Sequence, residues 1–299
     1  MSFSTKQLSI MQRHNINCLM VKALENNEVP WQKPWEGRGK NIGFPKCAFT
    51  HKKFFGINVL LLQMAAKRHK FVSQWWASSD QFARMGATVK PRPRNVAPGE
   101  WGTGIIFYKS EDDDILTTSA VMYNAEQLQS PIKEFDTDSV LAPNYFLAER
   151  VLHATTARIN YNDNDEDEAW YFYPPHDFIS IPPKRIFEKG LGGLPAYYES
   201  LAHELIHWTE SRLDFVAEEA ITELRADIGA AFLMEELSIP HSISLSNYYK
   251  WKGQWLNLMK KDVNLIFKIS ASACKAVDYI LSRSTTAPER YNQLDESAA

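Results

Sequence analysis

The chain has 299 residues, enough for two ordinary domains or one large one. It is 44% hydrophobic and 23% charged, close to the globular average, which excludes a largely disordered chain and a fibrous repeat. The net charge of −3 hides an asymmetry. Residues 1–109 hold 17 Lys and Arg against 5 Asp and Glu (+12), so residues 110–299 hold 16 against 31 (−15). This division predicts two domains with different partners.

The sequence shows none of the usual signals for export or membrane insertion. The N-terminal residues lack the basic-then-apolar layout of a signal peptide, and no apolar run approaches the roughly 18 residues needed to span a bilayer. The three cysteines are scattered and form neither a disulfide framework nor a CxxC pair. We therefore expect a cytoplasmic protein with no membrane partner.

The basic front half mixes short helices with loops and strands. Its longest predicted helix covers residues 5–27 and stops before Pro30, and a loop rich in Gly, Lys and Arg follows at 36–46. The other elements expected here are helices at 57–66 and 79–85, an extended Pro/Arg-rich segment at 88–98, and strands at 104–108 and 120–123. We predict a basic α+β domain over residues 1–130.

The acidic back half is predicted to be mostly helical. A linker at 131–143 leads to a domain at 144–285, and residues 286–299 form a frayed tail. The elements expected in this domain are helices at 144–156, 197–213, 217–237 and after 246, an acidic loop at 162–168, and β-rich runs at 169–173 and 178–181. The predicted fold class is therefore α+β, with two domains.

One motif carries metal chemistry: His203-Glu204-Leu-Ile-His207 has the HExxH pattern. On a helix, residues four apart lie on one face, so both imidazoles can give a nitrogen to one Zn²⁺ at about 2.0–2.1 Å. Glu204 follows the first histidine and is the candidate general base for a water molecule at the metal. The alternative interpretation is a histidine pair satisfied in the core.

A third ligand is expected because catalytic zinc takes three protein ligands and keeps one position open. Glu223 and Asp227 lie four apart on the next predicted helix. This arrangement resembles the gluzincin metallopeptidases, in which a Glu-x-x-x-Asp on that helix supplies the third ligand and its Asp hydrogen-bonds a ligating histidine. The resemblance makes Glu223 the ligand and Asp227 the supporting residue, with Asp227 as direct ligand the alternative. The expected cofactor is Zn²⁺, and another divalent metal such as Mn²⁺ is the second choice.

A peptidase also needs an edge strand that holds substrate backbone and a donor for the oxyanion. Tyr171-Phe172-Tyr173 is the candidate strand, and Tyr197, Tyr198 and Tyr249 are candidate donors. The sequence does not choose among these three tyrosines.

The front half interleaves basic and aromatic residues, as proteins do when they hold single strands by charge and base stacking. The candidate DNA-binding residues are Trp31, Trp35, Arg38, Lys40, Lys46, Lys52, Lys53, Phe54, Lys67, Arg68, Lys70, Trp75, Trp76, Arg84, Arg92 and Arg94. The competing interpretation assigns at least half of the aromatic residues to core packing and several lysines to ordinary surface. The ensemble charge of +12 still favours single-stranded DNA as the partner.

Taken together, the chain resembles the ArdC antirestriction family of conjugative plasmids, to which the N-terminal region of TraC-type plasmid primases is related. The resemblance covers nearly all of residues 1–285. It rests on Pro30-Trp31-Gln-Lys-Pro-Trp35, on the segments that begin at Phe55, Trp76, Tyr123 and Ala169, on His203 to Thr209, and on Glu223 to Leu233. Family members show Glu where this chain has Thr222, which argues against position 222 as the ligand.

The resemblance implies a single-stranded-DNA-binding N-terminal domain, a zincin-like C-terminal domain, and a role in carrying plasmid DNA past host restriction. Three hypotheses follow. In the first, the protease acts on a host restriction-system protein. In the second, DNA coating alone protects, and the metal site is structural or vestigial. In the third, a DNA-tethered protease acts on protein–DNA adducts.

Overall fold

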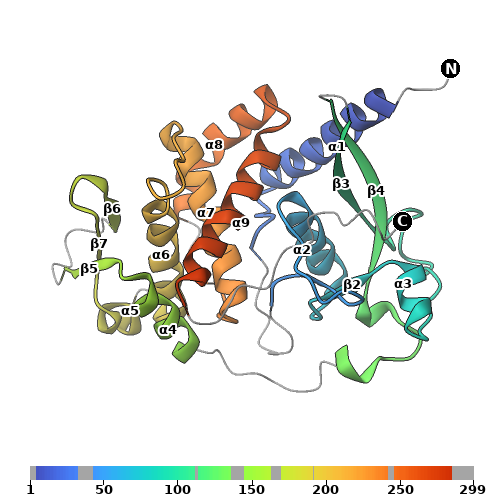
Figure 1. Ribbon diagram of the computed structural model, residues 1–299, viewed down its shortest axis with the longest axis horizontal. Helices are drawn as coiled ribbons and strands as arrows, with labels where there is room; N and C mark the ends of the chain where they lie inside the picture. The colour runs from blue at the N-terminus through green and yellow to red at the C-terminus, as the bar shows by residue number, and fades with distance from the viewer. Residues whose placement is uncertain are drawn as a thin grey trace.

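Helices make up most of the molecule, with one small sheet toward each end of its long axis (Figure 1). The structure is a computed structural model, and it describes residues 5–32, 43–111, 114–135, 145–162, 170–190, 192–241 and 246–284. Every structural statement below refers to these residues.

The N-terminal half joins three helices to a four-stranded sheet. The helices are α1 (Thr5–Glu25), α2 (Ile57–His69) and α3 (Ser79–Arg84). The strands are β1 (Lys46–Cys47), β2 (Trp75–Ala77), β3 (Thr103–Glu111) and β4 (Asp114–Asn124), in the order β1-β2-β4-β3. The long β3–β4 pair is antiparallel, with Thr103 opposite Met122, and short β1 lies parallel to β2. A capping box between Ser78 and Gln81 fixes the start of α3.

The C-terminal half is dominated by helices. They are α4 (Tyr145–Thr155), α5 (Lys184–Gly190), α6 (Gly193–Trp208), α7 (Glu219–Glu236), α8 (Ser246–Lys261) and α9 (Leu265–Ser282). The strands β5 (Arg158–Tyr161), β6 (Tyr171–Tyr173) and β7 (Phe178–Ile181) form a sheet in the order β5-β7-β6. Strand β7 is parallel to β5 and antiparallel to β6, so β6 lies at an edge of this sheet.

These elements confirm the predicted α+β class. The helix predicted over 197–213 begins four residues earlier, since Pro195 is tolerated in a first helical turn, and it ends at Trp208. The sequence did not predict β5 or α5. The expected acidic loop, most of the expected linker and the expected tail lie outside the described residues, so the exact domain limits stay a prediction. None of the described helices combines the length and apolarity needed to cross a membrane.

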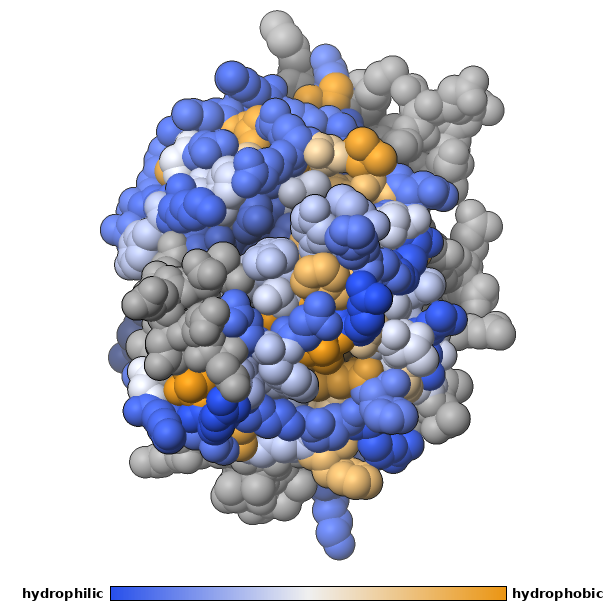
Figure 2. All heavy atoms as spheres, turned by 90° about the vertical axis from the view of Figure 1, so that its left-hand side faces the viewer, coloured by the Kyte–Doolittle hydropathy of each residue, from blue (hydrophilic) through white to orange (hydrophobic). Residues whose placement is uncertain are grey.

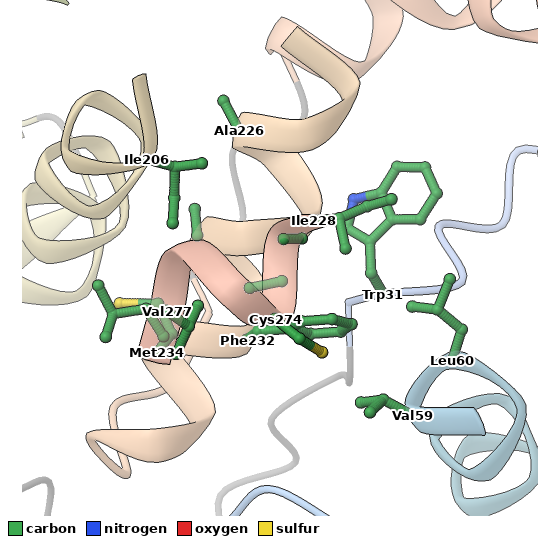
Figure 3. Packing of buried hydrophobic residues seen from close by; sticks show 14 of the residues in the cluster. Trp31, Val59, Leu60, Ile206, Ala226, Ile228, Phe232, Met234, Cys274 and Val277 are labelled. Atoms are coloured by element: carbon green, nitrogen blue, oxygen red, sulfur yellow. The ribbon is translucent and has the colours of Figure 1, made fainter. Parts of the chain in front are cut away.

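One hydrophobic core joins the two halves. Its buried residues run from Met20 in α1 to Ile280 in α9, with α1 packed on α8 and α2 packed on α9. Figure 3 shows Trp31 and Leu60 from the N-terminal half beside Ile228 of α7. The division seen in the charge is therefore a property of the surface, and the interior is continuous across it.

A buried ion pair also crosses between the halves. Lys53 Nζ lies 2.6 Å from Glu236 Oε1 at the end of α7, and their side chains are only 5% and 10% exposed. The prediction that Lys53 contacts DNA is wrong for this conformation, because its ammonium is enclosed with a carboxylate partner. Removing one member of such a pair leaves an uncompensated buried charge.

We predict that Glu236→Ala lowers the free energy of unfolding by about 3–5 kcal/mol in urea denaturation. Combining Lys53→Met with Glu236→Leu should recover most of that loss, because no buried charge then remains. The matched control is Lys260→Ala, which removes a pair of equal length (2.6 Å) to Glu25 that is 53% and 46% exposed. We expect the control to cost less than about 1 kcal/mol. Equal losses for the buried and exposed pairs would contradict the assignment.

Candidate metal centre

Helix α6 presents the two histidines of the HExxH motif on one face. His203 and His207 are one turn apart, and their Nε2 atoms lie 3.2 Å from each other. Both side chains are mostly covered, at 16% and 14% exposure. The helix therefore points two nitrogen donors at a common position, as its 3.6-residue period requires.

Helix α7 brings a carboxylate to the same position. It can approach α6 closely because Gly229 has no side chain: a Cβ there would lie 2.7 Å from Cδ1 of Ile206. Glu223, nearly two turns before Gly229, places Oε2 3.4 Å from His203 Nε2 and Oε1 3.6 Å from His207 Nε2. The three side chains form a triangle of donor atoms.

The triangle is close in size to one face of a tetrahedral metal shell, in which donors at 2.0–2.1 Å lie about 3.3 Å apart. The two histidine nitrogens are 3.2 Å apart, and each lies within 3.6 Å of a different carboxylate oxygen of Glu223. One ligand atom from each of the three residues lies within 4.8 Å of the other two. Within the described ranges, His203, His207 and Glu223 are the one group of three or more potential ligands with this spacing. Two imidazoles and one carboxylate therefore fit a divalent metal and match the ligand count of catalytic, not closed structural, zinc sites.

Charges around the triangle favour a cation at its centre. Burial alone would lower the pKa of His207, but hydrogen bonds to Glu210 and Glu223 outweigh it and raise that pKa to about 10. Burial would likewise raise the pKa of Glu223, but hydrogen bonds from the two histidines hold it below its usual value. The site stabilises positive charge between these groups, for which a proton and a metal ion compete.

Glu204, which follows His203 on α6, lies in a protected setting. Its side chain is buried, and burial raises its pKa, while the nearby positive charge on His203 and His207 opposes the rise. The backbone of Phe172, in the middle of β6, also donates a hydrogen bond to it. A carboxylate with a raised pKa next to a metal position is suited to general-base chemistry near neutral pH.

The edge strand β6 therefore lies directly at the site. The sheet neighbour of β6 is β7 on one side, and no described strand pairs with its other side. Tyr171 and Tyr173 are exposed, and Phe172 between them is directed inward. Figure 2 views this end of the molecule, where a mostly hydrophilic surface is interrupted by apolar groups in a hollow near its middle.

Two of the tyrosines considered as oxyanion donors are occupied elsewhere. Tyr197 and Tyr198 are buried in α6. The Tyr197 hydroxyl lies 3.4 Å from that of Tyr161, and the Tyr198 hydroxyl donates to Glu149. Tyr249 on α8 is exposed, so it is the one of the three whose hydroxyl is accessible to a ligand.

The hydrogen bonds that orient the histidines differ from those that the sequence predicts. Asp227 is partly buried, and the hydrogen bonds that the structure gives it come from Trp31 Nε1 at 2.8 Å and Asn247 Nδ2 at 3.5 Å, not from a histidine. His207 is instead oriented by Glu210, whose Oε1 lies 2.7 Å from Nδ1 and leaves Nε2 directed at the triangle. Sequence reasoning missed Glu210, although its position three residues after His207, on the same face, is a signal that could have found it.

The structure divides the predicted DNA contacts into four groups. Lys67, Arg68, Lys70, Arg84, Arg92 and Arg94 are exposed or partly exposed. Lys46, Lys52 and Trp75 are half-buried, and Lys46 Nζ lies 5.8 Å from the Trp75 ring centre. Trp35, Arg38 and Lys40 lie outside the described residues. Trp31, Lys53, Phe54 and Trp76 are buried.

The prediction that these four buried residues touch DNA is wrong for this conformation. Trp31 and Trp76 are at most 1% exposed and Phe54 is 4% exposed, all within the shared core. A ring enclosed by protein on both faces cannot stack on a base. Their positions beside basic clusters reflect a short N-terminal half in which core and surface alternate quickly along the chain.

Comparison with known proteins agrees with this architecture. The family model described as the N-terminal domain of anti-restriction factor ArdC matches residues 11–137, and the zincin-like metallopeptidase model matches residues 147–272. The chain belongs to the ArdC family. It is similar in structure to the Mn(II)-bound crystal structure of the antirestriction protein ArdC from the R388 plasmid, with a TM-score of 0.71 and 25% identity over 92% of this chain and 98% of that one.

Relatives in sequence include two Escherichia coli proteins named DNA primase TraC. Each is 29% identical over 88% of this chain, but the chain spans only 26% and 19% of their lengths. The uncharacterized protein y4eC of Sinorhizobium fredii is 22% identical over 90% of this chain and 91% of its own length. The ArdC architecture is thus also found as one part of much longer proteins.

We predict that Glu223→Ala sharply lowers the metal content of the purified protein, because two histidines alone are a weak site. The measurement is elemental analysis of zinc and manganese after dialysis against a metal buffer. Glu219→Ala, an exposed position in the first turn of the same helix, is the control and should keep full occupancy. An unchanged metal content in Glu223→Ala would show that another residue is the third ligand, and Asp227 would be the first residue to test.

Proposed function

We propose that this ArdC-family protein binds single-stranded DNA through its N-terminal half and acts as a metal-dependent peptidase through its C-terminal half. The observation that carries the peptidase is the donor triangle of His203, His207 and Glu223 with buried Glu204 against it. The histidine and carboxylate donors suit Zn²⁺ and also accept Mn²⁺. We further propose that the protein protects incoming plasmid DNA from host restriction.

His203, His207 and Glu223 would hold the metal. A divalent ion bound there supplies Lewis-acid chemistry: it polarises a carbonyl and makes water more acidic. Glu204 then takes a proton from the attacking water and delivers it to the leaving amine, a role that suits its raised pKa. The side of β6 that no described strand pairs with would bind the substrate as an extended strand, which places a peptide bond next to Glu204.

The exposed basic residues support DNA binding by the other half. Lys67, Arg68 and Lys70 cluster at the end of α2, and Arg84, Arg92 and Arg94 follow on and after α3. Arg68 Nη1 lies 3.8 Å from Glu100 Oε1, an exposed contact that phosphate can replace with little loss. Such contacts hold a phosphate backbone without reading its sequence, in keeping with a partner whose sequence is arbitrary.

We predict that changing Lys67, Arg68 and Lys70 together to Gln weakens binding to a single-stranded oligonucleotide. The slope of log K against log salt should also fall by about 0.7 for each phosphate that the variant no longer neutralises. Changing Lys260 and Lys261 to Gln removes exposed charge from α8 in the acidic half and is the control. Fluorescence anisotropy at several salt concentrations measures both. Equal effects from the two sets would show a general charge effect and not a site.

We predict that Glu204→Gln abolishes protection of unmodified plasmid DNA conjugated into a restricting recipient, because the variant lacks the general base. Donors supplying wild type, Glu204→Gln or no protein are compared by transconjugant yield. Metal content and DNA binding of the variant should stay near those of wild type. Cleavage of a host restriction-system protein should disappear with protection.

Full protection by Glu204→Gln would contradict the proteolytic mechanism. It would leave coating of the DNA as the sufficient activity, with the metal site structural or vestigial. Loss of protection without a cleaved restriction protein would instead direct the search to protein–DNA adducts as substrates.

A further inference from the structure

Trp31 belongs to the N-terminal half but ends beside the metal centre. Its side chain is completely buried next to α7 (Figure 3). Its ring meets that of Trp255 of α8 edge-on, with the ring centres 5.8 Å apart. The indole Nε1 donates a 2.8 Å hydrogen bond to Oδ2 of Asp227. This contact joins residues 196 positions apart in the sequence.

Asp227 is one turn after Glu223 on α7 and therefore on the same face of that helix. Its other oxygen has Asn247 Nδ2 at 3.5 Å, a longer contact, so the indole is the closer of the two donors. Burial raises the pKa of Asp227, and its hydrogen bond from Trp31 opposes that rise. The two donors hold the partly buried carboxylate in one orientation on the face of α7 that carries Glu223.

We propose that Trp31 is a positioning residue of the metal centre: its indole N–H fixes the Asp227 carboxylate one turn from Glu223 on the same face of α7, so the N-terminal half completes the site. This inference rests on the proposed metal site. Groups behind the ligands typically change metal affinity by about 10- to 100-fold, because they set the orientation and basicity of the ligand itself. Trp31 would act at one further remove, through Asp227.

The test compares Trp31→Phe with Trp255→Phe. Both variants remove one buried indole N–H and keep an aromatic ring in the same cluster, but Trp255 donates to the Ala220 carbonyl and not to Asp227. Chelator competition measures the zinc affinity of each protein, and the visible absorption of the cobalt-substituted protein reports the ligand geometry. We expect Trp31→Phe to bind zinc at least about 10-fold more weakly than wild type, and we expect the absorption spectrum of its cobalt form to be shifted. Trp255→Phe should stay within about twofold of wild type.

The outcomes distinguish a failure of this inference from a failure of the proposed metal site. If the wild-type protein binds no metal, the proposed metal site is wrong. Wild-type affinity and spectrum in Trp31→Phe would overturn the positioning role, as would equal weakening in both tryptophan variants. Should Trp31→Phe not fold, Asp227→Asn decides, since it keeps the size of the side chain and removes its charge. Unchanged zinc affinity and an unchanged cobalt spectrum in Asp227→Asn would equally overturn the proposal.

Discussion

The close packing of α6 on α7 is the constraint on which the site depends. Two histidines four residues apart on one helix share a face, but the third donor reaches them only if the second helix comes near enough. Gly229 allows this, because any side chain there would meet Ile206 at 2.7 Å. A wider spacing of the helices would move the Glu223 oxygens beyond the 3.4–3.6 Å now seen and open the triangle past the size of a metal shell.

The same interior makes the two halves interdependent. A chain with +12 on one part and −15 on the other suggests separate bodies, yet one hydrophobic core runs from α1 to α9. A buried ion pair, Lys53 with Glu236, and a partly buried hydrogen bond, Trp31 with Asp227, cross the same boundary. The charge asymmetry therefore describes the surfaces of the two halves and not a division of the interior.

Predictions from the sequence were correct where they depend on local geometry, and they were less accurate where they depend on tertiary packing. The positions of the helices, and the shared face of His203 and His207, follow from a fixed helical period. Family resemblance singled out Glu223, because no local rule says which helix packs on which. Trp31 and Trp76 were misassigned since tryptophans beside lysines look alike whether they face solvent or core. Only the tertiary structure shows that both are enclosed.

A continuous core would have a thermodynamic consequence for the two ligands proposed for this protein. Metal stabilises whatever conformation brings His203, His207 and Glu223 together, and that conformation includes the packing of Trp31 against α7. A ligand on the N-terminal half that shifts this packing must change metal affinity, and the metal must change the affinity for that ligand by the same factor. Two independently folded domains joined by a linker would show no such reciprocity. In this fold the halves share the interior that holds His203, His207 and Glu223 in place, so we expect the proposed binding of nucleic acid and of metal to be coupled.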